Sequence, residues 1–286
     1  MASVRLGLYE KSMPNELTLT EKLVAARTAG FDYLELSIDE SDEKLARLDW
    51  THEERRQLMN AIQDTGIPIH SICLSGHRRF PLGHPDPAVQ QKGLSLMQKA
   101  ITLAVDIGVR IIQIAGYDVY YEASSEQTRA AFASNLRLCV QMAARHGVIL
   151  AFETMETAFM NTVGKAMEWV TQMQSPYLQL YPDIGNLTNA AKSYDADVSE
   201  DLEKGRCHFA AVHLKETQPG IFREVPYGAG HVDFVSAIAA FLQFGVRMFV
   251  GEFWHLGEEN WPGILTHNHT FLRGAIAEGE RRMEKA

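Results

Sequence analysis

Short apolar runs alternate with longer amphipathic stretches along the whole chain. The first run, residues 4–9, breaks at Met13-Pro14, as a strand that leads into a loop should. Seven more runs rich in Ile, Val and Leu follow at 31–38, 67–74, 110–115, 148–153, 178–183, 210–213 and 248–252. Short, nearly continuous apolar runs of this kind are typical of strands buried on both faces. The pattern therefore predicts eight parallel strands.

Segments with helical periodicity separate these runs, at about 18–29, 51–66, 87–107, 125–145, 162–173, 199–205, 232–244 and 264–284. Thr51 with Glu54 three residues later predicts a capping box. Regular alternation of strands and helices implies parallel pairing with right-handed crossovers. No Gly-x-Gly-x-x-Gly or Walker-type loop follows the first strand, which disfavours nucleotide-binding folds. We expect a (β/α)₈ TIM barrel, with residues 1–286 as one domain.

Four acidic or imidazole side chains stand at or next to the ends of the last four apolar runs, namely Glu153, Asp183, His213 and Glu252. They are roughly 30 to 40 residues apart, about one strand–helix–strand unit. Because the C-terminal strand ends of a barrel converge on one mouth, these side chains can meet around one ion. Any one alone is more often a salt-bridge partner or a helix cap, but the joint pattern indicates a metal site. Three carboxylates and an imidazole suit Mn²⁺, Co²⁺, Zn²⁺ or Mg²⁺.

Charge and composition limit the classes of partner that we expect for this protein. The formal charge of −9, from 36 acidic and 27 basic residues, disfavours a nucleic-acid partner but leaves a small anionic substrate open. Three scattered cysteines without CxxC spacing are typical of a reduced, cytosolic setting. The chain starts without a signal-like segment, and no apolar run is long enough to span a membrane. We expect a cytoplasmic homo-oligomer, a dimer, with no membrane partner.

Two loops at the predicted mouth carry basic side chains. His77, Arg78 and Arg79 follow the third strand, where an anion-binding role is weighed against an ordinary solvated cluster. A long loop punctuated by Gly and Pro follows His213 and carries Lys215 and Arg223. Long structured loops in compact domains tend to be functional. An arginine there can contact an oxyanion or a diol through two hydrogen bonds, although an exposed loop arginine is an equally good interpretation.

Six segments carry a resemblance to a known family: Leu8-Tyr9-Glu10-Lys11, Arg47-Leu48-Asp49-Trp50, 74–83 (with His-Arg-Arg-Phe-Pro), 115–121, Tyr181-Pro182-Asp183-Ile184-Gly185-Asn186-Leu187, and 212–217. Together they resemble the L-ribulose/L-xylulose 5-phosphate 3-epimerases, which are xylose-isomerase-like TIM barrels related to the ketose 3-epimerases. The resemblance runs from about residue 4 to about residue 255. It implies one divalent metal and epimerisation at C3 of a phosphorylated pentulose.

The resemblance also implies roles for single residues. By motif match, Glu153, Asp183, His213 and Glu252 would be the metal ligands. Arg223 would correspond to the arginine that precedes Pro-x-Gly-x-Gly in ketose epimerases. Asn186 stands where the free-ketose epimerases carry a substrate-contacting histidine. We therefore expect the substrate contacts at this position to differ from theirs.

The chemistry assigns the catalytic roles to two glutamates. Inversion needs a base on one face of C3 and an acid on the other. Glu153 and Glu252 come from different strands, and we expect them to exchange these roles. Further substrate-binding candidates are Lys215, His77, Asn186 and Glu156, although Glu156 also fits a second-shell or surface position. Barrels often hold phosphate after strands seven and eight, which favours Lys215 over the His77 loop.

Three alternative functions remain at this stage. An aldose–ketose isomerase of the hexulose phosphate or hydroxypyruvate type would use the same barrel. A phosphodiester endonuclease would need several metals, more strand-end histidines and a less acidic chain. A sugar-phosphate sensor without activity would not need the pair of glutamates.

Overall fold

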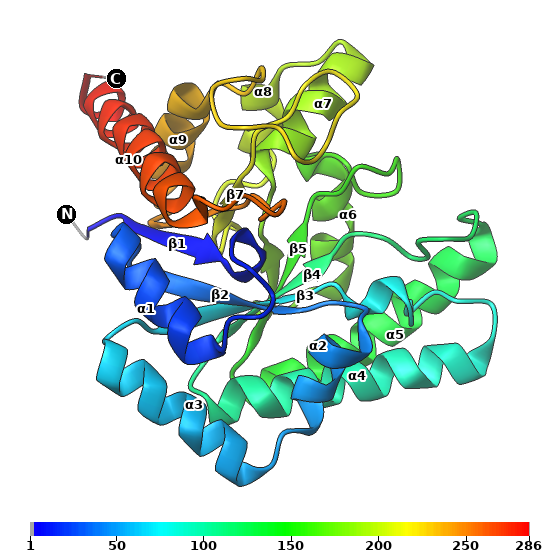
Figure 1. The fold of residues 1–286 in the computed structure, drawn as a ribbon. Helices are drawn as coiled ribbons and strands as arrows, with labels where there is room; N and C mark the ends of the chain where they lie inside the picture. Colours follow the sequence, from blue (N-terminus) through cyan, green and yellow to red (C-terminus); the bar gives the residue numbers. More distant parts are fainter. Residues whose placement is uncertain (1–2, 286) are drawn as a thin grey trace.

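The computed structural model describes residues 3–285 and confirms the eight-stranded parallel barrel. The strands are β1 (Arg5–Tyr9), β2 (Tyr33–Ile38), β3 (Ile69–Leu74), β4 (Ile111–Ala115), β5 (Ile149–Glu153), β6 (Leu178–Leu180), β7 (Val212–Leu214) and β8 (Met248–Gly251). Their order in the sheet is β6-β5-β4-β3-β2-β1-β8-β7. Figure 1 shows the strands at the centre of the molecule with the helices around them.

Single parallel bridges, rather than a regular ladder, join the two end strands β6 and β7. Leu180 pairs with Phe209, and Asp183 pairs with His213. The backbone N–H of His213 donates to the carbonyl of Pro182 at 2.9 Å. These contacts bring the ends of the sheet together, so that Asp183 and His213 lie side by side at the mouth.

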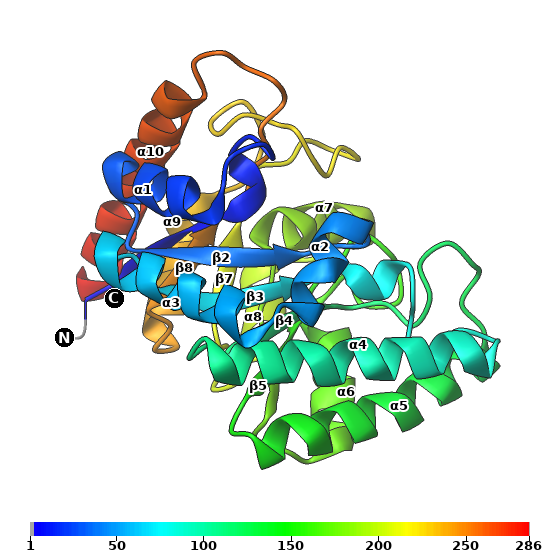
Figure 2. The same cartoon turned by 60° about the horizontal axis from the view of Figure 1, so that its bottom comes forward.

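The helices are α1 (Leu19–Ala29), α2 (Asp42–Ala46), α3 (His52–Thr65), α4 (Pro87–Asp106), α5 (Glu126–Arg145), α6 (Val163–Met173), α7 (Ile184–Tyr194), α8 (Val198–Glu203), α9 (Phe234–Gln243) and α10 (Trp261–Lys285). Figure 2 shows α3, α4 and α5 along one side of the sheet. The capping box at Thr51 and Glu54 is present. No helix in residues 3–285 is both long and apolar enough to cross a membrane.

The helix α7 was not predicted from the sequence, which left the segment between Asp183 and residue 199 without a helix. In the structure, the side chain of Asp183 accepts a hydrogen bond from the backbone N–H of Asn186 and caps α7. The connection from β6 to β7 therefore contains α7 and the short α8. Asp183 both starts a helix and faces the barrel mouth.

Alternation along the strands separates two buried layers. Leu34, Leu36 and Ile38 face the helices and belong to the main hydrophobic core. Tyr33 belongs to a second cluster inside the barrel, which consists of Tyr9, Tyr33, Cys73, Ala151, Tyr181, Ala211 and Val250. Gly7 makes room for this interior packing, since a Cβ atom at that position would overlap the Tyr33 ring.

A buried carboxylate fixes the turn after β1. Glu10, in the 3₁₀ turn η1 (Glu10–Ser12), accepts hydrogen bonds from Lys22 at 3.0 Å, Lys44 at 2.6 Å and Arg47 at 2.6 and 2.8 Å. Burial alone would raise the pKa of Glu10, but the hydrogen bonds and charge of Arg47, with the charges of the two lysines, hold this pKa well below its usual range. The ion cluster ties α1 and α2 to the end of the first strand.

Candidate metal centre

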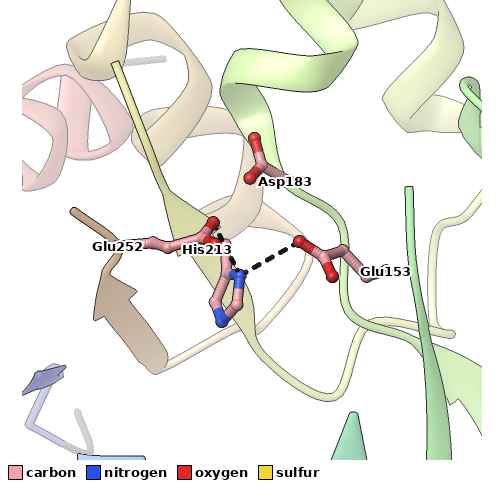
Figure 3. Close-up of side chains that lie close together, drawn as sticks. All are labelled: Glu153, Asp183, His213 and Glu252. Atoms are coloured by element: carbon pink, nitrogen blue, oxygen red, sulfur yellow. Dashed lines mark ion pairs between the residues drawn. The ribbon is translucent and has the colours of Figure 1, made fainter. Parts of the chain in front are cut away.

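The four strand-end residues meet at the mouth of the barrel. Glu153 is the last residue of β5, Asp183 caps α7, His213 is the middle residue of β7, and Glu252 directly follows β8. All four are buried, and one ligand atom from each lies within 4.8 Å of the others. In Figure 3 their polar ends point toward a common space from different elements.

The atoms that face this space suit a cation. The Nδ1 atom of His213 lies 3.0 Å from Oε2 of Glu252 and 3.4 Å from Oε1 of Glu153 (dashed lines in Figure 3). This Nδ1 atom, Oε2 of Glu252 and Oδ2 of Asp183 are buried and make no hydrogen bond of regular geometry; their near neighbours are charged groups of the same cluster. Buried polar atoms rarely lack regular hydrogen bonds, and several converging ones indicate a missing ligand. Carboxylate oxygens and an imidazole nitrogen fit a divalent ion of the Mn²⁺, Co²⁺, Zn²⁺ or Mg²⁺ class.

Glu35 of β2 orients the histidine from behind. Its Oε1 atom lies 2.6 Å from Nε2 of His213, and both side chains are fully buried. The other oxygen, Oε2, accepts hydrogen bonds from Ser71 at 2.6 Å and Tyr181 at 2.8 Å. A carboxylate that accepts the Nε2 proton leaves Nδ1 free to bind metal, the usual arrangement for a metal-bound histidine. Glu35 lies within an apolar run and was not predicted from the sequence as part of the site.

Lys215 is buried beside the carboxylates of the centre. Its Nζ atom is 2.7 Å from Oδ2 of Asp183 and 3.8 Å from Oε2 of Glu252, and it donates to Oδ1 of Asn186 at 3.0 Å. Asn186 in turn donates to the carbonyl of Thr154 at 2.8 Å. Lys215 and Asn186, both predicted to bind substrate, therefore lie together beside Asp183.

The ionisable side chains of the centre shift one another's pKa values. Burial would lower the pKa of His213, but the charges of Glu35 and Glu252 raise it well above its usual value. Burial raises the pKa of Asp183 to about 7 against the opposing charge of Lys215. For Glu252, the charges of Lys215 and His213 outweigh burial and lower the pKa. In the metal-free protein, protons and one ammonium group compensate the carboxylates, and a bound cation would replace those protons.

A second set of contacts joins four loops outside the metal centre. The guanidinium of Arg78 lies 4.4 Å from the centre of the Tyr120 ring. The Tyr120 hydroxyl donates to Oε1 of Glu156 at 3.2 Å, and Arg223 donates to the same oxygen at 3.3 Å. Glu156 and Arg223 thus lie together, outside the four ligand-type residues. Arg223 also lies 6.0 Å from the ring centre of Trp254.

His77 is placed differently from the other substrate-binding candidates. The side chain is buried, and its Nε2 atom lies 3.1 Å from the carbonyl oxygen of Gly93 in α4. Burial lowers the pKa of His77 to about 4, so the imidazole is neutral at pH 7. These contacts direct His77 toward α4, whereas its neighbour Arg78 reaches Tyr120.

Comparison with known proteins places the chain in a family. The model of the xylose isomerase-like TIM barrel family matches residues 23–274. The L-ribulose-5-phosphate 3-epimerase UlaE of Salmonella paratyphi C is 46% identical over 275 residues, which cover 96% of this chain and 95% of the relative. UlaE of Escherichia coli O157:H7 is 48% identical over 242 residues, 85% of this chain and 84% of the relative.

Solved structures show the same fold at low identity. An L-ribulose 3-epimerase superposes with a TM-score of 0.78 at 20% identity, covering 98% of this chain and 97% of the other. D-psicose 3-epimerase from Clostridium cellulolyticum H10, solved with D-tagatose, superposes with a TM-score of 0.79 at 15% identity, covering 95% of this chain and 99% of the other. With relatives of nearly half-identical sequence over most of its length, the chain belongs to the L-ribulose-5-phosphate 3-epimerase family of xylose isomerase-like TIM barrels.

Proposed function

We propose that this protein is a metal-dependent L-ribulose-5-phosphate 3-epimerase, which interconverts L-xylulose 5-phosphate and L-ribulose 5-phosphate. The activity named for its relatives supports this reaction. The observation that carries the proposal is the pair of buried glutamates beside His213 Nδ1, Glu153 at the end of β5 and Glu252 directly after β8. Two carboxylates that approach one centre from different strands are what inversion at a carbon requires.

Glu153 and Glu252 are proposed as the acid/base pair. The ionised glutamate removes the C3 proton, and the electrons of the broken C–H bond move into the C2–C3 bond and onto O2. The other glutamate, protonated, gives its proton to C3 on the opposite face, which re-forms the C2 carbonyl and inverts the centre. After one turnover the two residues have exchanged protonation states, and the reverse reaction starts from that state.

The metal site would consist of Glu153, Asp183, His213 and Glu252, which fit one divalent ion by residue type and by ligand atoms that all lie within 4.8 Å of one another. When bound, the ion supplies Lewis-acid stabilisation of the negative charge that develops on O2. Glu35 keeps the proton of His213 on Nε2, and Lys215 and Asn186 hold Asp183 in place. Among the metals, we propose the Mn²⁺, Co²⁺, Zn²⁺ and Mg²⁺ group without a choice within it.

Basic side chains around the four ligand-type residues are the candidates for substrate binding. Arg223, with 41% of its side chain exposed and close to Glu156, is available to support O2 or a neighbouring hydroxyl of the sugar. Lys215 is only 4% exposed and paired with Asp183, which favours a role in the carboxylate cluster over the phosphate contact suggested by its position. Arg78 and Arg79 then become the first candidates for phosphate, which carries about two negative charges at pH 7. The homodimer and the cytoplasmic location remain predictions.

The experiment that tests the function measures which carbon of the sugar exchanges its proton with solvent. The Mn²⁺-loaded protein is incubated with L-xylulose 5-phosphate in D₂O, and the sugar is examined by NMR. The proposal predicts L-ribulose 5-phosphate that carries deuterium at C3. Deuterium at C1 with an aldose product would instead indicate an isomerase, and a sugar left without deuterium or conversion would exclude both reactions.

A further inference from the structure

The loop that carries Arg223, residues 217–231, starts directly after Glu216 (yellow in Figures 1 and 2). Glu216 is buried, with 3% of its surface exposed, although it stands at the base of an open loop. Neither the metal centre nor the acid/base pair uses this carboxylate. A buried carboxylate is costly unless its oxygens are hydrogen-bonded, so its partners indicate what it does.

Three backbone N–H groups, from both ends of the loop, donate to the Glu216 carboxylate. Oε1 accepts from Thr217 at 3.1 Å and from Val232 at 3.1 Å, which closes the base of the loop. Oε2 accepts from Gly228, twelve residues after Glu216, at 3.1 Å. The Glu216 side chain therefore connects the first and the last part of the loop.

The surrounding backbone is built closely against this carboxylate. Gly230 has no room for a side chain, because a Cβ atom there would overlap the Glu216 carboxylate and the Thr217 carbonyl. Gly228 has a φ of +82°, a left-handed conformation that glycine adopts at little cost. His231 donates its backbone N–H to the Thr217 carbonyl at 3.0 Å, a further bond across the base of the loop. The glycines at 228 and 230 therefore allow the loop backbone to approach the Glu216 carboxylate closely.

The far end of the loop is attached to α7 through Asn189, whose Oδ1 accepts from the Gly220 backbone N–H at 3.0 Å and whose amide donates to the Ile221 carbonyl at 3.4 Å. Arg223 makes one 3.3 Å hydrogen bond to Glu156, and 41% of its side chain is exposed. The backbone near it is held by the Gln218–Ile221 bridge, at 2.8 and 3.1 Å. Arg223 lies between this anchor at Gly220 and the Glu216 bond to Gly228, so one of the two attachments that flank it is made by Glu216.

We propose that Glu216 is a positioning residue: its carboxylate clamps the base of loop 217–231 and thereby holds Arg223 over the metal centre for substrate binding. This inference rests on the substrate role proposed for Arg223. It assigns Glu216 an effect on the encounter with substrate, and none on metal binding, because its hydrogen bonds go to loop backbone rather than to the four ligand-type residues.

The first test is a double-mutant cycle with Glu216→Gln and Arg223→Ala. Glutamine keeps the size of the side chain but replaces one acceptor oxygen by a donor, so at least one loop N–H loses its partner. Loss of a hydrogen bond that involves a charged group changes an equilibrium constant by a factor of about ten or more. We expect each single variant to lower kcat/KM about tenfold or more, mainly through KM, with unchanged metal content. The double variant should be no worse than Arg223→Ala alone. Losses that multiply would show that Glu216 does not act through Arg223.

The second test measures the clamp without using activity. Hydrogen–deuterium exchange of the peptide that covers residues 217–232 should be about tenfold faster in Glu216→Gln, while exchange in β5 stays the same. Glu224→Gln removes the same charge from an exposed position in the same loop and should exchange like the wild type. Unchanged exchange in Glu216→Gln would overturn the clamp. Faster exchange together with wild-type kinetics in Arg223→Ala would instead overturn the substrate role of Arg223 and leave the clamp standing.

Discussion

Glu35 and His213 lie 178 residues apart in the chain, yet their side chains meet inside the barrel at 2.6 Å. The contact determines which imidazole nitrogen faces the other ligands. The hydroxyls of Ser71 and Tyr181 donate to the other oxygen of Glu35, which fixes the orientation of the carboxylate. The metal centre therefore includes a second layer that reaches β2 and β3.

This relationship predicts the effect of Glu35→Gln. A glutamine can present either an acceptor or a donor to Nε2, so His213 loses its fixed tautomer. Metal affinity should fall about 10- to 100-fold, as is typical for loss of a carboxylate behind a metal-bound histidine. Competition with a chelator measures the affinity. Glu53→Gln, at an exposed position on α3, serves as the control and should bind metal like the wild type. Wild-type affinity in Glu35→Gln would contradict the role given to this residue.

The acid/base pair is tested by Glu153→Gln and Glu252→Gln. Each should lower the rate of epimerisation about 10²- to 10⁴-fold at saturating metal, since each removes one proton-transfer group. Each variant should still exchange the C3 proton of one epimer with D₂O, because the remaining glutamate can remove and return the proton on its own face. Glu156→Gln should keep most of its activity. Full activity in either of the first two variants would refute the two-base assignment.

Lys215→Met separates two roles for the buried lysine. Its pairing with Asp183 predicts that KM rises by the same factor for L-xylulose 5-phosphate and for free L-xylulose. Metal should bind at least as tightly as in the wild type, because a positive charge beside a ligand has been removed. A much larger rise in KM for the phosphorylated sugar would assign Lys215 to the phosphate.

The Glu10 cluster predicts a stability effect that depends on pH. Because the folded-state pKa of Glu10 lies below the unfolded value, its contribution to stability is present above about pH 4.3 and is lost as pH falls below it. Glu10→Gln should lower the free energy of unfolding at pH 7 by about 3–5 kcal/mol, because three buried cations lose their carboxylate. The loss should shrink in acid. Urea unfolding at pH 7 and at about pH 2.5, well below the unfolded-state pKa, checks both points, and an equal loss at the two pH values would contradict the assignment.

Much of the fold and the four-residue centre could be predicted because both follow from strand position. Each of Glu153, Asp183, His213 and Glu252 stands at or near a strand end, and parallel strands of a barrel must bring those ends to one mouth. Neither partner residues nor distances are needed for that inference.

The features that were missed depend on pairings across the barrel. Alternation in β2 places Tyr33, Glu35 and Ser37 on the inner face, a signal for Glu35 that a search for apolar runs overlooks. The helix α7 begins with Ile-Gly-Asn, whose glycine and asparagine are weak helix formers, so its start depends on the Asp183 cap. Lys215 was expected to contact the substrate phosphate from the loop after the seventh strand, but it is buried beside two carboxylates from other strands, which offset its charge.

Metal titration of the C3 proton exchange tests the central claim most directly. The protein is stripped with a chelator, and deuterium incorporation at C3 of L-xylulose 5-phosphate is followed as Mn²⁺ is added. We predict that the stripped protein exchanges no C3 proton, that exchange saturates at one ion per chain, and that Asp183→Ala, although folded, neither retains a stoichiometric ion nor recovers exchange. Undiminished exchange without metal, or a stoichiometric ion in Asp183→Ala, would contradict a metal-dependent epimerase centred on these four residues.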